Sequence, residues 1–334
     1  MGLLVNGKWQ DKWYDTDKTG GKFKREEARF RNWVTRDGSA GPSGESGFPA
    51  ASGRYHLYVS MACPWAHRTL IFRKLKGLEE HIGVSVVHPD MLENGWEFRP
   101  DDKTHQDSLH NARFLHQLYT RVAPDYTGRV TVPVLWDREG EDIVSNESAD
   151  IIRMLNSAFD DLDGVDHSLD FYPAELRKEI DQVNERVYDT VNNGVYKTGF
   201  ATAQDVYERA YDALFESLDW LEQRLAGHRY LVGQRVTEAD WRLFTTLIRF
   251  DAVYYSHFKC NRERLSDFPN LSGYLRDLYQ VPGVAETVDI DQIKRHYYVS
   301  QRTINPTQIV PVGPRLDFDA PHGREKLGPG FQAG

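Results

Sequence analysis

The stretch Tyr58–Thr69, with the sequence YVSMACPWAHRT, constrains the fold of this chain more than any other. An apolar run over 55–59 precedes it and predicts a short buried strand, while the apolar spacing after it predicts a helix over about 64–76. Cys63 then lies at a strand-to-helix turn, and Pro64 takes the first helical position, where its missing N–H is not needed. The backbone N–H groups and the helix dipole at such a turn favour a thiolate, which makes Cys63 a candidate nucleophile.

The alternative for Cys63 is a buried structural cysteine, because cysteine is among the most frequently buried residue types. The order strand, cysteine, proline, aromatic residue, helix favours the nucleophile. Ala66 stands where a Cys-x-x-Cys motif has its second thiol, so no internal disulfide forms there. A mixed disulfide at Cys63 therefore needs an external thiol to resolve it, and glutathione is the natural candidate. The second cysteine, Cys260, is predicted to be a structural residue or a bystander.

The motif Cys63-Pro64-Trp65-Ala66 after a strand resembles the active site of thioredoxin-fold glutathione transferases, specifically the glutathionyl-hydroquinone reductases of the Xi class. The resemblance extends to the stretch 296–307, HYYVSQRTINPT, and several separated motifs agree in order. It implies a thioredoxin-like α/β domain followed by an all-α domain. It also implies an oxidoreductase that reduces glutathionyl-hydroquinones to hydroquinones through a Cys63–glutathione mixed disulfide, with glutathione as co-substrate.

Two other functions remain open at this point. A general glutathione-dependent thioltransferase or dehydroascorbate-type reductase would use the same Cys63 chemistry without a tyrosine pocket. A non-enzymatic binding module on a transferase-like fold would form no mixed disulfide with glutathione disulfide. A conjugating transferase is disfavoured, because such enzymes activate the glutathione thiol with a hydroxyl, and a cysteine there would trap the ligand instead.

Shifts in composition predict four segments along the chain. A loop rich in Gly, Ser and Pro covers 38–53, and an acidic loop covers 160–172. The aromatic residues within 1–37 predict that this part docks on the folded chain, and the tail from about 300 is rich in Pro and Gly. The predicted segments are an N-terminal extension (1–53), a thioredoxin-like glutathione-binding domain (54–160), an all-helical substrate domain (170–290) and a C-terminal extension (291–334).

The secondary-structure pattern of the first domain begins strand, helix, strand, with the second strand over 82–87. This order implies parallel pairing and a right-handed crossover. A helix is predicted over about 107–122 and a strand over 129–136, although Pro133 interrupts that strand and suits only a sheet edge. The resemblance implies that Pro133 is a cis-proline beside the active cysteine. In the second domain, helices are predicted over about 173–198, 203–226, 237–256 and 268–280.

The resemblance places the glutathione site on two further motifs. Val132 and Pro133, together with Val130 on the same run, are expected to bind the cysteinyl backbone of glutathione. Glu147 is expected to take the ammonium of the γ-glutamyl end, and Ser148 its carboxylate. The alternative for a serine at this helix start is a simple N-cap.

Two more residues complete the predicted glutathione site. Arg129 is expected to pair with the glycyl carboxylate through its planar guanidinium, the alternative being a solvated charge at a strand edge. Trp96 is expected to pack on glutathione near Cys63. Its alternative is a surface aromatic residue that anchors the irregular insertion over 88–106.

Three tyrosine motifs fall in the second half of the chain. Any one of the 17 tyrosines is more often a packing residue than a catalytic one. The resemblance nevertheless selects Tyr196 as the general acid, and Tyr254 and Tyr297 as groups that hydrogen-bond the hydroquinone oxygens. Which member of the adjacent pairs 254/255 and 297/298 faces the pocket stays open.

Two features are interpreted as structural. The sequence VTEADW over 236–241 predicts a helix start with a capping box between Thr237 and Asp240, so a folding role is assigned to it. Four basic residues of the first helix are predicted to form an ordinary solvated face: Arg68, Arg73, Lys74 and Lys76.

The composition limits the partners and the compartment. A formal net charge of −9 argues against a nucleic-acid or anionic-membrane partner. Two cysteines make a disulfide framework improbable and fit a reducing cytoplasm. Residues 1–10 show no signal pattern, no apolar run reaches membrane-spanning length, and no histidine or cysteine spacing is typical of a metal site. A homodimer is expected from the family resemblance alone.

Overall fold

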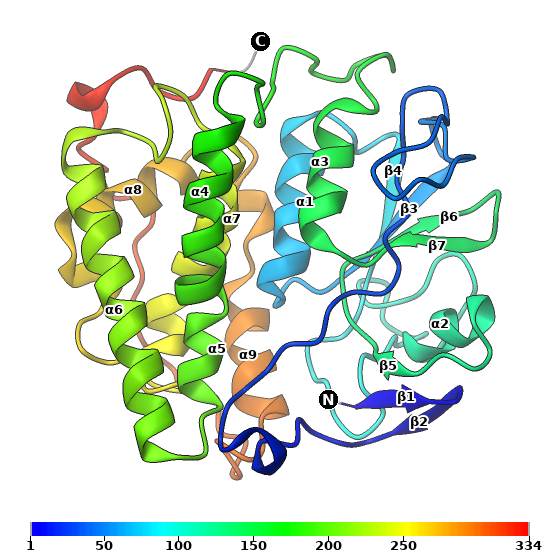
Figure 1. Cartoon of the computed structure of the whole chain (residues 1–334), viewed down its shortest axis with the longest axis horizontal. Coiled ribbons are helices and arrows are strands. Elements are labelled where there is room, and N and C mark those ends of the chain that lie inside the picture. Colours follow the sequence, from blue (N-terminus) through cyan, green and yellow to red (C-terminus); the bar gives the residue numbers. More distant parts are fainter. Residues whose placement is uncertain (1, 333–334) are drawn as a thin grey trace. The chain divides into compact units, whose positions relative to one another are not determined.

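The computed structural model describes residues 2–332 (Figure 1). Its contacts divide the chain into two compact units. The first, here called the α/β unit, holds the residues up to Trp13, Glu26–Leu169 and Thr287–Ile309. The second, here called the helical unit, holds Tyr14–Arg25, Asp170–Glu286 and the residues from Val310 onward. The N-terminal segment is thus shared between the two units, and the four predicted segment boundaries stay predictions.

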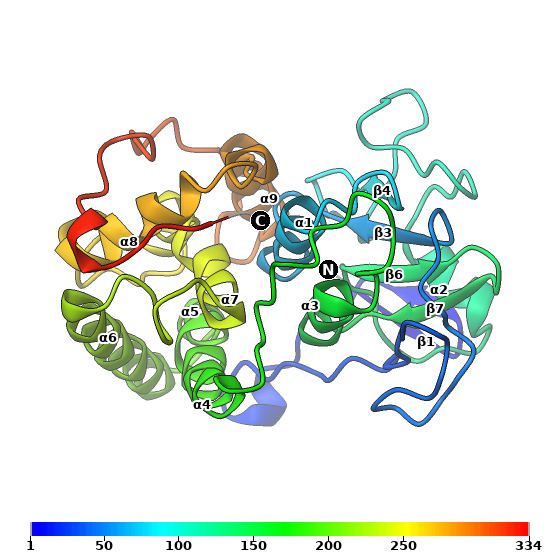
Figure 2. The ribbon, with the colours of Figure 1, turned by 90° about the horizontal axis from the view of Figure 1, so that it is seen from above.

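A four-stranded sheet with the order β4-β3-β6-β7 forms the centre of the α/β unit. Its strands are β3 (Tyr55–Val59), β4 (Ile82–Val86), β6 (Val134–Asp137) and β7 (Asp142–Ser145). β3 runs parallel to β4 and antiparallel to β6, which is antiparallel to β7. Helices α1 (Pro64–Leu75) and α3 (Ser148–Ser157) pack against each other on one side of the sheet (Figures 1 and 2). The predicted strand–helix–strand unit and its parallel pairing are confirmed, and β3 is buried at every position, as a central strand should be.

A second, antiparallel sheet joins the N-terminal strands to the middle of the chain. Its strands are β2 (Lys8–Gln10), β1 (Leu3–Val5) and β5 (Gly128–Arg129). The turn between β1 and β2 is Asn6-Gly7, whose φ angles of 46° and 72° are those a tight hairpin requires. Farther along, the Phe30 ring stacks on Tyr126 with 5.6 Å between the ring centroids. The aromatic N-terminal segment therefore docks on the folded chain, as predicted.

The helix predicted over 107–122 is wrong in its first half, because α2 covers only His116–Val122. The Asp107 carboxylate accepts hydrogen bonds from three backbone N–H groups that follow it, at 3.0, 3.3 and 2.9 Å. A side chain that bonds the nearby backbone competes with helical bonding. Asp107 thereby keeps the residues just after it in an irregular turn.

The strand predicted over 129–136 is wrong as a single element. Arg129 ends β5 in the small sheet, whereas β6 in the large sheet begins at Val134. The residues 130–133 connect the two sheets, and the peptide bond between Val132 and Pro133 is cis, as predicted. A proline cannot donate a ladder hydrogen bond, which explains why the regular pairing breaks at this position.

The helical unit contains five α-helices among its described residues (Figure 1). They are α4 (Arg177–Val187), α5 (Gly194–Gly199), α6 (Gln204–Gly227), α7 (Glu238–Leu247) and α8 (Pro269–Tyr279). The helices predicted over 173–198 and 237–256 are each interrupted by a π-helical turn, at Tyr188–Asn192 and Phe250–Tyr254. Such turns follow an i→i+5 pattern, which hydrophobic spacing does not reveal. Short 3-10 turns cover Asp17–Thr19, Leu265–Asp267, Ala285–Thr287 and Glu325–Leu327.

The start of α7 has the predicted capping box. The Asp240 carboxylate accepts the Thr237 backbone N–H at 2.7 Å and the Leu231 backbone N–H at 2.9 Å. It also accepts the Tyr274 hydroxyl at 2.7 Å, and Asp240 is fully buried. These bonds tie the loop before α7 and helix α8 to one carboxylate, which fits the folding role predicted for this motif.

The last helix, α9 (Ile290–Ser300), and the residues after it up to Ile309 belong to the α/β unit, whereas the described tail from Val310 onward belongs to the helical unit. Arg324 is 3% exposed and donates to the backbone carbonyls of Leu225, His228 and Arg229. Within residues 2–332, no helix combines the length and the hydrophobicity needed to cross a membrane.

Candidate active site

Three parts of the chain that carry the predicted chemistry reach the same edge of the four-stranded sheet. β3 ends at Val59 and leads into Cys63. β6 runs the opposite way, so it begins at this edge, with Val134 paired to Tyr58 directly after the cis-proline. β7 reverses again and ends here at Ser145, just before α3. Alternating strand directions thus bring the cysteine turn, the cis-proline and the start of α3 together.

Cys63 occupies the N-cap position of α1, with Pro64 at the first helical position, as predicted. Its carbonyl accepts the His67 N–H at 3.0 Å, which begins the helical bonding. The side chain is largely buried, with 9% of the residue exposed, and Sγ lies 3.6 Å from the carbonyl oxygen of Val132. The cysteine sulfur and the cis-proline loop are therefore in contact, as the resemblance requires.

A buried tyrosine that the sequence analysis did not select holds the loop before the cis-proline. The Tyr119 hydroxyl donates to the Thr131 carbonyl at 2.8 Å and accepts the Thr131 N–H at 3.2 Å. It also accepts the Asn146 side-chain amide at 3.2 Å, and burial raises the pKa of this phenol. Tyr119 thereby connects the loop at Val132 to the residue before Glu147. In the sequence it is one apolar-face residue of an amphipathic helix, so no local signal marks it.

The start of α3 is capped by Glu147, so the alternative that Ser148 is the N-cap is wrong. The Glu147 carboxylate accepts the Ala149 N–H at 2.9 Å, and the Glu147 N–H donates to Ser145 Oγ at 3.1 Å. Ser148 is the first helical residue and is 3% exposed. The predicted pair lies side by side at a helix N-terminus, where backbone N–H groups favour a bound carboxylate.

The basic face predicted on α1 is wrong for two of its four members. Arg68 is 1% exposed, its guanidinium lies 4.6 Å from the Trp65 ring centroid, and Nη1 donates to Ser148 Oγ at 3.4 Å. Lys76 is fully buried, with Nζ 2.9 Å from the Asp160 carboxylate. These long side chains have partners in α3 and in the loop after it, which helical spacing alone does not supply. Arg68 therefore contacts Ser148 of the predicted glutathione site, a contact that the sequence analysis missed.

Trp96 is buried, with 6% of its surface exposed, so its ring does not lie on the surface, but it anchors the insertion as the alternative predicted. It stacks on His296 of α9 with 4.8 Å between the ring centroids and 15° between the planes. His296 Nδ1 lies 2.7 Å from the Pro89 carbonyl oxygen. The insertion that carries Trp96 is thus anchored on α9. The contact of Trp96 with glutathione stays a prediction.

The Arg129 side chain is also buried, which excludes the alternative of a solvated strand-edge charge. Nη1 donates to the Lys12 carbonyl at 2.6 Å, and Nε lies 3.8 Å from the Glu26 carboxylate. Arg129 therefore fastens the N-terminal segment of the α/β unit. Val130 and Val132, the next predicted glutathione residues, are buried on the connection between the two sheets.

The predicted tyrosines fall into two groups. Tyr196 on α5 and Tyr254 at the end of its π-helical turn lie in the helical unit, with 6.1 Å between their ring centroids. Phe258 stacks on Tyr254 at 5.5 Å and contacts Tyr196 at the same distance. Tyr297 belongs to the α/β unit, where its ring packs edge-on against His296 at 5.2 Å. Tyr196 and Tyr254 thus lie together in the helical unit, and their roles toward a hydroquinone stay predictions.

Cys260 is fully buried in the helical unit, and burial raises the pKa of its thiol. Its Sγ lies 3.9 Å from the Phe258 carbonyl oxygen. A buried neutral thiol is inert, which fits the structural role predicted for Cys260. Among residues 2–332, no group of three or more His, Cys, Asp or Glu side chains is arranged to hold a metal ion.

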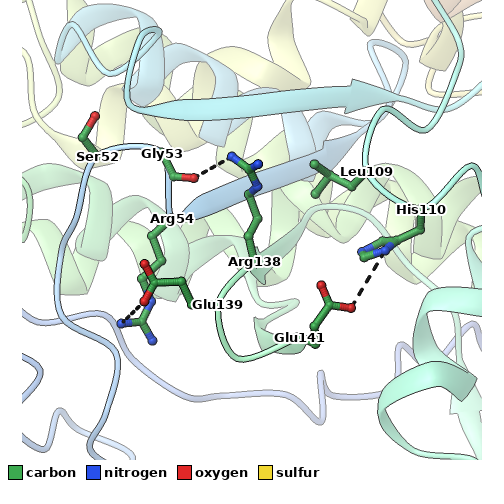
Figure 3. Close-up of a pocket in the computed structure, with 8 residues that line it drawn as sticks. All are labelled: Ser52, Gly53, Arg54, Leu109, His110, Arg138, Glu139 and Glu141. Carbon is green, nitrogen blue, oxygen red and sulfur yellow. Dashed lines mark hydrogen bonds and ion pairs between the residues drawn. The ribbon is translucent and has the colours of Figure 1, made fainter.

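A pocket of about 450 Å³ lies at the opposite edge of the sheet from Cys63 (Figure 3). Gly53 and Arg54 precede β3, and Arg138 follows β6, so the pocket surrounds the other ends of the same strands. Arg54 is bound by both oxygens of the Asp137 carboxylate at 2.9 and 2.6 Å, and Arg138 donates to the Gly53 carbonyl at 2.7 Å. The two guanidinium groups thus connect the residues before β3 to those at the end of β6, and they are separate from the cysteine site.

Comparisons with known proteins match both halves of the chain. Residues 62–158 match the family described as "Glutathione S-transferase, N-terminal domain", and residues 204–277 match "Glutathione S-transferase, C-terminal domain". The chain is 59% identical to the glutathionyl-hydroquinone reductase YqjG of Escherichia coli, covering 97% of this chain and 99% of that protein. It is 54% identical to the glutathionyl-hydroquinone reductase PcpF of Sphingobium chlorophenolicum, covering 94% and 96%.

Solved structures give the same result. The glutathione-bound structure of Escherichia coli YqjG superposes with a TM-score of 0.89 at 56% identity, covering 97% of this chain and 99% of that one. The Xi class transferase of Natrialba magadii superposes with a TM-score of 0.89 at 48% identity, covering 98% of each chain. These matches confirm the predicted fold, a thioredoxin-like α/β part followed by an all-α part. The chain belongs to the glutathione S-transferase family and, within it, to the glutathionyl-hydroquinone reductases of the Xi class.

Proposed function

We propose that this protein reduces glutathionyl-hydroquinones to hydroquinones, with glutathione as co-substrate and Cys63 as the nucleophile. The observation that carries the proposal is the identity of 59% and 54%, over almost the whole chain, to two relatives named for this activity. Cys63 at the start of α1, in contact with the cis-proline loop and with Ala66 in place of a resolving thiol, supplies suitable chemistry.

The reaction takes two exchanges at sulfur. The Cys63 thiolate attacks the sulfur of the conjugate, so that an S–S bond forms and the carbon–sulfur bond to the ring breaks. The ring carbon leaves with the electron pair and takes a proton, which gives the hydroquinone. A second glutathione, as thiolate, then attacks the glutathione sulfur of the mixed disulfide. Glutathione disulfide leaves, the Cys63 thiolate returns, and the proton of the second glutathione replaces the one given to the ring.

Glutathione is held, in this proposal, by the groups at the sheet edge. Val132 and Pro133, with Val130, take its cysteinyl backbone. Glu147 and Ser148 take the ammonium and carboxylate of its γ-glutamyl end, since a helix N-terminus favours the carboxylate. Arg129 takes the glycyl carboxylate, and Trp96 packs on the peptide.

The tyrosines serve the aromatic leaving group. Tyr196 gives the proton to the ring carbon as general acid. Tyr254 and Tyr297 hydrogen-bond the hydroquinone oxygens, since a phenolic O–H both donates and accepts. A homodimer in the cytoplasm is part of the same proposal. It rests on family habit and on the cysteine content, and light scattering of the purified protein tests the dimer.

The covalent step is tested by intact mass after incubation with glutathione disulfide. The protein is expected to gain one glutathione, which added glutathione then removes. Cys63→Ser should gain none and should lose hydroquinone formation, whereas the matched Cys260→Ser variant should behave like the unaltered protein. A glutathione adduct on Cys63→Ser, or full turnover by that variant, would contradict the proposal.

Replacing Tyr196 separates this activity from general disulfide reduction. In a disulfide substrate the leaving group is a thiolate, which needs no proton donor. Tyr196→Phe should therefore lower hydroquinone formation and spare the reduction of a small disulfide by glutathione. Equal retention of both activities would remove Tyr196 from the mechanism.

A further inference from the structure

The N-terminal segment Tyr14–Arg25 packs within the helical unit, although about 150 residues separate it from α4, the first α-helix there. The Gly21 carbonyl accepts the Thr202 N–H at 3.1 Å. Gly21 has φ +84°, and a Cβ at this position would lie 2.7 Å from the Ala203 Cβ. Only glycine fits here. The backbone of this segment thus packs closely against the connection between α5 and α6.

Two side chains of this segment reach the proposed general acid. Phe23 is 7% exposed, and its ring lies 6.2 Å from the Tyr196 ring and 5.3 Å from the Phe200 ring, between centroids. Arg25 follows two residues later and contacts the same ring as Phe23. Its guanidinium carbon lies 5.1 Å from the centroid of the Tyr196 ring, within the range of a cation–π contact.

A hydrogen bond fixes the guanidinium over that ring. Arg25 Nε donates to the side-chain oxygen of Asn193 at 2.9 Å. Asn193 is the N-cap residue of α5, three residues before Tyr196, and is itself 6% exposed. Arg25 therefore contacts both the residue that begins the helix and the ring that the helix carries. A planar guanidinium can bond at its edge and stack with its face, which a lysine ammonium cannot do.

We propose that Arg25 is a positioning residue for Tyr196, which holds the phenol in place and stabilises the charge that develops on it. The inference rests on the proposed function, in which Tyr196 donates a proton. As the proton leaves, the ring becomes negatively charged, and its attraction to the guanidinium grows. The contact is thus stronger in the transition state than in the ground state, which is the condition for it to accelerate the reaction.

Double-mutant kinetics test this proposal. Glutathionyl-hydroquinone reduction and small-disulfide reduction are measured for the unaltered protein, Arg25→Gln, Tyr196→Phe and the double variant. Arg25→Gln should lower kcat for the hydroquinone reaction about tenfold and change KM less than about twofold, because a cation–π contact is of that magnitude. Disulfide reduction should stay unchanged. In the Tyr196→Phe background, Arg25→Gln should have less than about a twofold effect, because Arg25 acts through the phenol.

Two further variants complete the experiment. Arg25→Lys should lower kcat less than Arg25→Gln does, since lysine keeps the charge but lacks the planar guanidinium. Lys24→Gln removes the same charge from the exposed neighbouring position and should leave both reactions unchanged.

Four results would overturn the inference. An equal loss in both reactions would show a merely structural role for Arg25. A tenfold loss that persists in the Tyr196→Phe background would place its action elsewhere, and an unchanged kcat would remove any role. If Tyr196→Phe alone kept full hydroquinone turnover, the proposed proton donor would fail, and the inference with it. The Tyr196→Phe variant by itself shows whether Tyr196 is the proton donor. A failure of the proposed function can therefore be told apart from a failure of the inference about Arg25.

Discussion

We expect the burial of a histidine in the central sheet to make the stability of the protein sensitive to acid. His56 lies on β3 and is 4% exposed, and its Nε2 is 2.9 Å from Ser85 Oγ. Removal of the imidazole from water disfavours its charged form and lowers the pKa of His56 from 6.5 to about 4. The negative charge of Asp107 offsets this effect only in part.

The sign of the effect follows from where the proton binds. In the unfolded chain His56 takes up a proton near pH 6.5, and in the folded chain near pH 4. Between these values the unfolded state binds more protons, so the free energy of unfolding falls as the pH decreases. The contribution of this group is fully present above pH 6.5. The difference corresponds to about 3 kcal/mol in total, of which about 2 kcal/mol is lost between about pH 7 and about pH 5.

Urea unfolding, followed by circular dichroism at both pH values, measures this loss. The test variant is His56→Gln, whose side-chain nitrogen can still bond Ser85 but does not titrate. Between about pH 7 and about pH 5, the free energy of unfolding of the unaltered protein should fall by about 2 kcal/mol more than that of the variant, since all other groups contribute equally to both. His228→Gln, at an exposed position, should keep the acid sensitivity of the unaltered protein. Equal losses in the unaltered protein and His56→Gln would refute the claim that burial keeps His56 neutral.

Three further substitutions test the contacts around the site and the fold. Arg68→Met should raise the KM for glutathione about tenfold in initial-rate kinetics, because it removes the buried donor to Ser148. An unchanged KM would mean that this hydrogen bond does not prepare the glutathione site. Tyr119→Phe should lower the free energy of unfolding in urea by about 1–3 kcal/mol, because the loop before the cis-proline loses a buried acceptor. In thermal denaturation, Thr237→Ala should lower the free energy of unfolding by about 1 kcal/mol. Asp240→Ala should lower it by about 3 kcal/mol, because this change leaves two buried N–H groups unpaired. An equal decrease in both variants would contradict this explanation.

The parts of the fold that the sequence predicted correctly are those set by local chemistry. The strand over 55–59, the turn at Cys63 and the proline at the first position of α1 all lie within one short stretch. The capping box of α7 likewise needs only residues three apart. Each of these features depends on backbone groups near in sequence, so spacing and residue type were enough to identify them.

The errors have a different physical origin. The first half of the predicted helix over 107–122 fails because one carboxylate, Asp107, bonds the backbone after it, and apolar spacing carries no record of that competition. Arg68 and Lys76 were predicted to be solvated because long charged side chains usually are. Their burial depends on Ser148 and Asp160, which come from elsewhere in the chain.

The tyrosine pair at 254/255 shows how a small backbone change decides which of two adjacent side chains is buried. Tyr254 is fully buried and packs against Tyr196, whereas Tyr255 is partly exposed. If a regular helix continued from α7, its period of 3.6 residues would set the directions in which residues 254 and 255 point. The π-helical turn Phe250–Tyr254 widens the spiral, so residues after it are rotated relative to that count. Periodicity therefore cannot choose between the two tyrosines, and the choice follows only from how the turn packs Tyr254 against α5.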